Sequence, residues 1–202
     1  MVRTDPKYDA VAAQYDARWP FYLRETIGRT VAQLDPRPGQ RLLDVGCGTG
    51  QLLADVAARW PGVMLAGVDP SPRMLEQAKT RVPAAHLVIG EAESLPAESA
   101  SVDWLVSTSA FHYVRDPFVA RREFRRVLRP GGTLVLTDWS ADFLTTRLQA
   151  RWSRAIDRNF QRIYSAVELQ AILVAGGFDV RVETYKINWY WGLLTVCARK
   201  SG

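Results

Sequence analysis

One short segment constrains the fold more than any other, because an apolar run ends there in a glycine-rich turn. The run covers residues 41–45 (RLLDV), and Gly46, Gly48 and Gly50 follow before helical periodicity begins at Gln51. Glycine lets the backbone turn sharply and lets a ligand approach without meeting a β-carbon. The helix that follows presents free N–H groups and its positive dipole end to an anion. A strand, a glycine turn and a helix in this order are typical of a nucleotide-type site in a doubly wound α/β sheet.

The middle of the chain predicts the same kind of sheet, because short β-rich runs alternate with segments of helical periodicity. Strands are expected at residues 41–45, 63–68, 85–89, 102–107 and 133–137. Helices are expected at residues 51–59, 72–81 and 117–128. We expect a helical stretch between each pair of successive strands, which predicts a parallel sheet.

The two ends of the chain complete the predicted fold. Residues 179–187 and 189–199 are strand-like runs joined by little more than Asn188, which predicts a hairpin and therefore one antiparallel strand. Residues 8–34 predict one or two helices that cap the ligand edge of the sheet or its flank. The expected fold is therefore α/β and doubly wound, with a mostly parallel seven-stranded sheet and one antiparallel strand near the C-terminus.

Size and composition indicate one soluble domain. The chain has 202 residues, of which 48% are apolar and 23% charged. We expect a helical cap (1–36), a cofactor-binding core (37–138), a substrate-lid insertion (139–164) and a last helix with the hairpin (165–202). The charged N-terminus and the lack of a long apolar run predict a cytoplasmic protein.

Few residues are available for disulfides or metal ligation. Two cysteines, Cys47 and Cys197, and two distant histidines, His86 and His112, predict neither a disulfide framework nor a metal site. The net charge of +5 is consistent with a solvated basic surface, and no nucleic-acid partner is expected. A monomer or a homodimer is expected.

The spacing of the glycines argues against a dinucleotide. The Gly-x-Gly-x-x-Gly fingerprint requires glycine where this chain has Gln51, and the third glycine falls one position early at Gly50. Asp69 follows the second expected strand, where a carboxylate accepts hydrogen bonds from both hydroxyls of an unphosphorylated ribose. A nucleoside ligand other than NAD or NADP is favoured, although a dehydrogenase stays an alternative.

Four strings in the same order resemble a known family. They are residues 43–50 (LDVGCGTG), 67–71 (GVDPS), 90–96 (GEAESLP) and 126–132 (RVLRPGG). Over roughly residues 40–140 the chain resembles the class I S-adenosylmethionine-dependent methyltransferases, in their ubiquinone and menaquinone biosynthesis-like branch. The resemblance implies S-adenosyl-L-methionine as cofactor, S-adenosyl-L-homocysteine as product and methyl transfer to a small organic acceptor.

The resemblance also implies roles for individual residues at the methionine end of the cofactor. The backbone of Gly46, Cys47 and Gly48 would pack there, and Asp44 would reach the ammonium, unless Asp44 merely caps the glycine turn. Asp69 would bind the ribose. The other cofactor contacts implied by the resemblance are those of Tyr15, Gly50, Pro70, Met74, Glu91, Ala92, Glu93 and Ser107.

Several of these contacts have an ordinary structural alternative. Met74 is equally suited to a helix core, and Tyr15, in the string that begins at Tyr8, is equally suited to helix packing. Glu91 stands where the family usually has aspartate, and residues 91–93 are also compatible with an acidic surface loop. His112 is the candidate catalytic base, since imidazole takes up a proton near neutral pH, but it could also only pack against the cofactor.

The segment 139–164 is expected to select the acceptor. Its arginines Arg147, Arg151, Arg154, Arg158 and Arg162 recur at steps of four and three, which predicts one basic helical face. Leu148, Trp152, Ile156, Phe160 and Ile163 make the roughly opposite face. With Trp139 and Phe143, the apolar face is expected to wall a pocket for an apolar or aromatic acceptor.

The basic face and the family resemblance both leave alternatives open. The basic face could favour an anionic molecule, contact an acidic membrane surface or simply be solvated. The chain could also be a sensor or partner subunit that binds the cofactor without catalysis. A nucleic-acid methyltransferase is disfavoured, because Ser107-Thr-Ser-Ala replaces the signature that amino-specific enzymes carry after the fourth strand.

Overall fold

A computed structural model of the chain describes residues 9 and 12–201, and Tyr8 lies outside the described residues. The strands are β1 (Arg41–Val45), β2 (Met64–Asp69), β3 (His86–Ile89), β4 (Val102–Thr108), β5 (Leu128–Trp139), β6 (Phe178–Lys186) and β7 (Gly192–Lys200). The helices are α2 (Tyr15–Arg18), α3 (Pro20–Val31), α4 (Gln51–Arg59), α5 (Pro72–Arg81), α6 (Pro117–Val127), α7 (Leu144–Ile156) and α8 (Ala166–Val174), with 3-10 turns at Ala12–Gln14 and Phe111–Tyr113.

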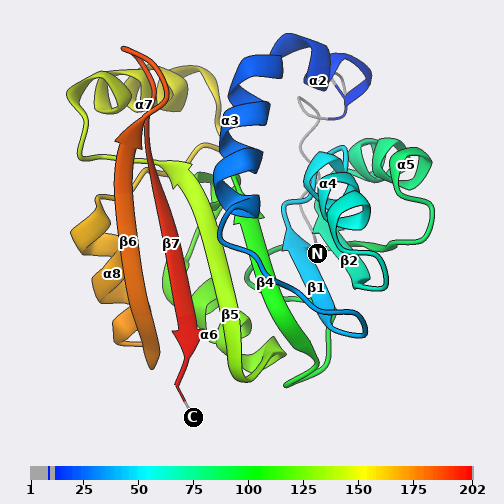
Figure 1. Cartoon of the computed structure of the whole chain (residues 1–202). Coiled ribbons are helices and arrows are strands. Elements are labelled where there is room, and N and C mark those ends of the chain that lie inside the picture. Colours follow the sequence, from blue (N-terminus) through cyan, green and yellow to red (C-terminus); the bar gives the residue numbers. More distant parts are fainter. Residues whose placement is uncertain (1–8, 10–11, 202) are drawn as a thin grey trace.

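The strands form one seven-stranded sheet in the order β3-β2-β1-β4-β5-β7-β6 (Figure 1). β1 pairs in parallel with β2 and β4, and β5 pairs in parallel with β4. β7 is antiparallel to both of its neighbours, β5 and β6. The predicted sheet, with one antiparallel strand near the C-terminus, is confirmed.

Helices cover both faces of the sheet, as Figure 1 shows for α3, α4 and α5 on one side and α6 and α8 on the other. Neighbouring residues of β1 belong to different cores, since Leu42 packs with α3 and α4 and Leu43 packs with α6 and α8. This alternation follows from the period of two in a strand. The carboxyl ends of the parallel strands stay free of this packing, and the site lies there.

The connection between β3 and β4 differs from the prediction. No helix forms in residues 90–101, which instead make turns and one isolated bridge between Glu91 and Ser94. Pro96 lies within this short segment, and proline removes a helical hydrogen bond from a helix interior. The expected helix between each pair of strands was therefore wrong at this position.

The C-terminal hairpin is shorter than predicted. β7 begins at Gly192, so the residues Trp189, Tyr190 and Trp191 lie in the connecting loop and not in the strand. The Asn188 side-chain oxygen accepts hydrogen bonds from the backbone N–H groups of Tyr190 and Trp191, at 2.8 Å and 2.7 Å. Such Asx turns compete with strand pairing and open the loop.

The predicted amphipathic helix of the segment 139–164 is only partly correct. α7 ends at Ile156, and the carboxylate of Asp157 accepts the backbone N–H of Asn159, which turns the chain away from the helix. Arg158 and Arg162 lie beyond this end, so the five arginines do not share one helical face.

The face that α7 buries also differs from the prediction, although Arg147, Arg151 and Arg154 are exposed as expected. α7 buries Thr146 and Ala150 against the protein. The side chains of Leu148, Trp152 and Ile156 are 61%, 65% and 59% exposed. The predicted apolar wall of an acceptor pocket is therefore wrong for these three residues. None of the helices described in residues 9 and 12–201 has the length and apolar character to cross a bilayer.

Candidate functional site

A cavity of about 260 Å³ opens at the carboxyl ends of β1, β2 and β4. Its lining contains twelve of the fourteen residues predicted for the site: Tyr15, Asp44, Gly46, Cys47, Gly48, Asp69, Pro70, Met74, Glu91, Ala92, Glu93 and Ser107. Gly50 and His112 are not in the lining. The topology explains this clustering, because the carboxyl ends of neighbouring parallel strands meet at one edge of the sheet.

The glycine turn holds its residues in the left-handed region, with φ of +77° at Gly46, +50° at Gly48 and +77° at Gly50. A Cβ at Gly46 would lie 2.4 Å from the Cβ of Ala110, whereas a Cβ at Gly48 would meet nothing within 4 Å. Gly46 therefore permits close packing of two loops, and Gly48 leaves open space on the cavity side. A Cβ at Gly50 would lie 3.0 Å from that of Ala78, so Gly50 serves the contact between α4 and α5.

The turn orients the Asp69 carboxylate at the end of β2. Its two oxygens accept the backbone N–H groups of Gly48, at 2.8 Å, and of Ser71, at 2.9 Å. Burial raises the pKa of Asp69 to about 6, although these two hydrogen bonds favour the charged form. These two hydrogen bonds hold the Asp69 carboxylate in one orientation, and Asp69 forms part of the cavity wall.

Asp44 carries an unsatisfied oxygen at the base of the cavity. The residue is 2% exposed, and its Oδ1 has no hydrogen-bond partner among the described residues. Burial and the nearby Asp69 raise the pKa of Asp44 to about 8. A buried carboxylate without a partner is costly, and a cation close to it removes that cost. The site therefore fits a ligand that brings a positive group to Asp44, as the ammonium of the expected cofactor would.

The loop after β3 also lines the cavity, through Gly90, Glu91, Ala92 and Glu93. The Arg115 guanidinium forms an ion pair with Glu91. The backbone N–H of Arg115 donates a hydrogen bond to Glu93 Oε1 at 2.8 Å. These contacts tie the loop to the segment after β4. Met74 lines the cavity and is almost fully buried, so it also belongs to the core. Its contact with the cofactor stays a prediction.

Tyr15, at the start of α2, contributes to the wall next to Asp69. Burial and the charges of Asp69 and Asp16 raise the pKa of its hydroxyl to about 12. Asp16 also accepts a hydrogen bond from Thr49 Oγ1 at 2.8 Å and pairs with Arg81 at 2.5 Å. The start of α2 is therefore attached to the glycine turn and to the end of α5.

His112 lies next to the cavity without lining it. Its Nδ1 is 2.6 Å from Asp138 Oδ1, and its backbone N–H donates to Asp138 Oδ2 at 2.9 Å. The ring stacks on Trp139 and contacts Phe160, with centroid distances of 5.2 Å and 5.1 Å. His112 therefore belongs to a buried cluster beside residues 107–113, which we term the floor of the cavity because Ser107, Thr108, Ser109, Ala110 and Tyr113 line it. The catalytic role predicted for His112 stays a prediction.

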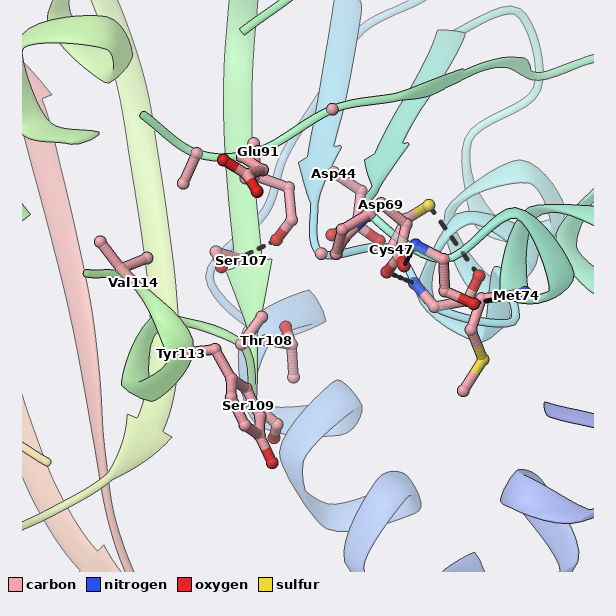
Figure 2. Close-up of a pocket in the computed structure, with 18 of the residues that line it drawn as sticks. Asp44, Cys47, Asp69, Met74, Glu91, Ser107, Thr108, Ser109, Tyr113 and Val114 are labelled. Carbon is pink, nitrogen blue, oxygen red and sulfur yellow. Dashed lines mark hydrogen bonds between the residues drawn. The ribbon is translucent and has the colours of Figure 1, made fainter. Parts of the chain in front are cut away.

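Figure 2 shows Thr108, Ser109, Tyr113 and Val114 on the side of the cavity opposite Cys47, Asp69 and Met74. Thr108, Ser109, Tyr113 and Val114 were not among the site residues predicted from the sequence. Ser109 has a φ of +57°, which is unusual for a residue with a side chain and recurs at functional sites.

Several other wall residues come from distant parts of the chain. They are Leu23 and Ile27 of α3 and Arg158, Asn159 and Gln161 from the segment after α7. An apolar residue of an amphipathic helix carries no sign that it faces a cavity, so no sequence signal could have found Leu23 or Ile27. Tyr22 Oη lies 2.7 Å from Ser109 Oγ, which attaches α3 to this wall.

Trp139 and Phe143 do not line the cavity, which corrects the prediction that they wall an acceptor pocket. The Trp139 indole donates to Tyr22 Oη at 2.7 Å. Phe143 fills the space above Gly192, where a Cβ would lie 2.1 Å from its ring. Both residues therefore support the fold around the site.

Several proteins that are similar to this chain are methyltransferases. Residues 43–136 match the family described as "Methyltransferase domain". The chain is 34% identical to the malonyl-[acyl-carrier protein] O-methyltransferase of Herminiimonas arsenicoxydans, over 90% of this chain and 68% of that protein. It spans only 34% to 50% of the length of some other relatives that it matches.

Solved structures share the fold at low identity. One chain of a Haloferax volcanii complex between the Trm112 methyltransferase activator and a methyltransferase matches with a TM-score of 0.84 and 22% identity. The match covers 99% of this chain and 100% of the chain in that complex. A Thermotoga maritima SAM-dependent methyltransferase matches with a TM-score of 0.77 and 22% identity, over 96% and 98% of the two chains. Together with the Herminiimonas relative, these findings show that the chain belongs to the class I S-adenosylmethionine-dependent methyltransferases.

Proposed function

We propose that the protein binds S-adenosyl-L-methionine in this cavity and transfers its methyl group to a small organic acceptor, leaving S-adenosyl-L-homocysteine. The observation that carries the proposal is the unsatisfied, buried oxygen of Asp44 beside a glycine turn and a fixed Asp69 carboxylate. Asp44 would pair with the ammonium, and Asp69 would accept the ribose hydroxyls. Glu91, Ala92, Met74 and Pro70 would surround the adenine.

The chemistry of this function makes few demands on side chains. The bound cofactor supplies an electrophilic methyl group on a positively charged sulfur. The residues of the chain then have to align the acceptor with that methyl group and exclude water, which lowers the entropic cost of bringing the two reactants together. Tyr15, Leu23 and Ile27 are positioned for this task, because they place α2 and α3 along the cavity wall.

A proton acceptor is needed only if the acceptor is a hydroxyl, a thiol or an acidic carbon. The pairing of His112 Nδ1 with Asp138 supports His112 in that role, since a carboxylate on one ring nitrogen sets the tautomer and orientation of the imidazole. Its position behind the lining supports a positioning role instead. Either role would act through the floor formed by residues 107–113.

We further propose that the acceptor combines an apolar body with an anionic group. Leu23, Ile27, Ala110 and Val114 supply apolar surface in the cavity lining, in place of the residues predicted for the wall, and they support an apolar body for the acceptor. Arg158 lines the same cavity, and the ion pairs found among the described residues do not include it. The malonyl group in the names of several relatives is one anionic example.

The variant Arg158→Gln tests this part of the proposal. Loss of a charged hydrogen bond costs about 1.5–3 kcal/mol, so we expect KM for an anionic acceptor to rise roughly 10- to 100-fold while the affinity for S-adenosylmethionine stays unchanged. Arg162→Gln is the matched control, because Arg162 follows in the same segment but is paired with Glu168 outside the cavity. Equal KM values for the two variants would contradict the assignment of Arg158.

The proposed function itself is tested by two measurements on the purified protein. Titration calorimetry with S-adenosylmethionine and S-adenosylhomocysteine should give saturable heat, and NAD should give none. Incubation of a small-molecule extract with methyl-labelled cofactor should then move the label to an acceptor. Binding without label transfer would favour the sensor or partner-subunit alternative, and absence of binding would overturn the proposal.

We propose a cytoplasmic protein, a monomer or homodimer, that acts on a small molecule and not on nucleic acid. The absence of a nucleic-acid partner is testable by gel shift at low salt, where contacts to phosphates are strongest. The Haloferax complex contains an activator chain, so co-purification of a partner subunit would modify this picture.

A further inference from the structure

The helix α7 presents an apolar stripe to the outside of the protein. Leu144, Leu148, Trp152 and Ile156 follow one another at steps of four residues, and all are more than half exposed. Residues at this spacing lie along one side of a helix. Single exposed apolar residues are ordinary on protein surfaces, whereas a continuous stripe marks an interaction surface.

A row of positive charge runs beside this stripe. Arg147, Arg151 and Arg154 are exposed, and the 13 residues of α7 contain no acidic side chain. None of these three arginines forms an ion pair within residues 9 and 12–201. Together, Leu144, Leu148, Trp152, Ile156, Arg147, Arg151 and Arg154 make up what we term the α7 surface.

The hairpin that joins β6 and β7 packs beside α7 and carries a further exposed aromatic residue. Phe143, at the start of α7, packs on Gly192 at the start of β7. The backbone N–H of Ser140 donates a hydrogen bond to the Gly192 carbonyl at 3.0 Å. Figure 1 shows the hairpin loop beside α7 at the same end of the sheet. Trp189 in this loop is 80% exposed. Tryptophan is enriched where a protein meets the boundary between lipid and water.

We propose that the α7 surface docks the protein onto an anionic lipid membrane. The apolar stripe would enter the boundary between headgroups and acyl chains, and the arginines beside it would lie among the anionic headgroups. Charge complementarity favours this occupant over a second copy of the chain. Because α7 has no carboxylate, pairing of two α7 helices would bring like charges together.

The docked orientation would bring one wall of the cavity close to the membrane. The chain leaves α7 at Ile156, and Arg158, Asn159 and Gln161 then line the cavity. Membrane binding by the α7 surface requires neither the cofactor nor methyl transfer, so it can be measured independently of the chemistry in the cavity.

Vesicle sedimentation with the full-length protein tests the proposal. The wild-type protein should sediment with vesicles of mixed phosphatidylglycerol and phosphatidylcholine at low salt, less at high salt, and little with phosphatidylcholine alone. The triple variant R147Q/R151Q/R154Q should bind the anionic vesicles about 100-fold more weakly, since each basic residue near such a surface contributes about a factor of five. The double variant L148E/W152E should lose at least about 10-fold, because two charges replace inserted apolar side chains.

A matched control is available on another helix. The double variant V167E/V174E introduces the same charges at two exposed valines of α8 and should bind vesicles like the wild type. Its far-UV circular dichroism and thermal unfolding, compared with those of L148E/W152E, show whether each variant is folded. Normal vesicle binding by folded L148E/W152E, or equal loss in both double variants, would overturn the proposal.

Two further results would also overturn it. Failure of the wild-type protein to sediment with anionic vesicles would remove the membrane as the occupant. Analytical ultracentrifugation that shows a dimer abolished by L148E/W152E, without vesicle binding, would assign the α7 surface to a second copy. Neither result would affect cofactor binding, so a failure of this proposal is distinguishable from a failure of the proposed function.

Discussion

The variant Asp44→Asn is expected to weaken S-adenosylmethionine binding roughly 10- to 100-fold, because it removes a charged partner of the ammonium worth about 1.5–3 kcal/mol. The same variant is expected to stabilise the cofactor-free protein. Asp44 is buried with an unsatisfied oxygen, and the pKa of its carboxyl is raised to about 8. A neutral amide of the same shape avoids the cost of the charge.

The pH dependence follows from the direction of the shift. The folded protein holds the Asp44 proton more tightly than the unfolded chain, so ionisation costs stability as the pH rises above the ordinary carboxyl range, and the cost is complete above about pH 8. The advantage of D44N in free energy of unfolding should therefore grow from pH 5 to pH 8 and reach at least about 2 kcal/mol. Cofactor affinity of the wild type should rise over the same range, and that of D44N should not follow it.

Thermal unfolding at pH 5 and pH 8, with and without S-adenosylmethionine, measures both effects. Asp55→Asn is the matched control, because this substitution makes the same chemical change at an exposed position of α4. D55N should leave the unfolding temperature and the affinity nearly unchanged. A D44N protein that unfolds at lower temperature than the wild type at pH 8, and binds the cofactor equally well, would contradict the assignment.

Alanine variants of three glycines should separate backbone strain from occupation of the site. Gly39, Gly46 and Gly48 all have positive φ, so each alanine costs about 1–2 kcal/mol of stability from strain. The G39A Cβ would meet nothing within 4 Å, and Gly39 lies outside the cavity lining, so G39A should lose only stability. The G48A Cβ would also meet no protein atom, but it lies at the cavity wall.

G48A is therefore expected to unfold like G39A but to lose roughly 10- to 100-fold in cofactor affinity, the equivalent of about 1–3 kcal/mol of overpacking. G46A should lose both affinity and further stability, since its Cβ would lie 2.4 Å from that of Ala110. Calorimetry and thermal unfolding on the three variants provide the comparison. Undiminished cofactor affinity in G48A would place the cofactor elsewhere.

Local patterns predicted much of the fold and of the cofactor side of the site. The strand before Gly46 is recognisable from its apolar run. The turn is recognisable from its glycines, because glycine adopts positive φ more readily than other residues. Asp69 was predictable for a similar reason, since it ends a strand next to the turn. The helix expected between β3 and β4 failed because a segment interrupted by Pro96 makes turns instead.

By itself the sequence determined the order of the strands and of most helices, the glycine turn and the positions of Asp44 and Asp69, because these depend on neighbours within a few residues. Only the tertiary structure decided that α7 turns its Leu148 and Trp152 outward, that His112 lies behind the cavity wall, and that Ile27 lines it. Periodicity shows that a helix has two faces, but which face is covered depends on contacts with residues far along the chain.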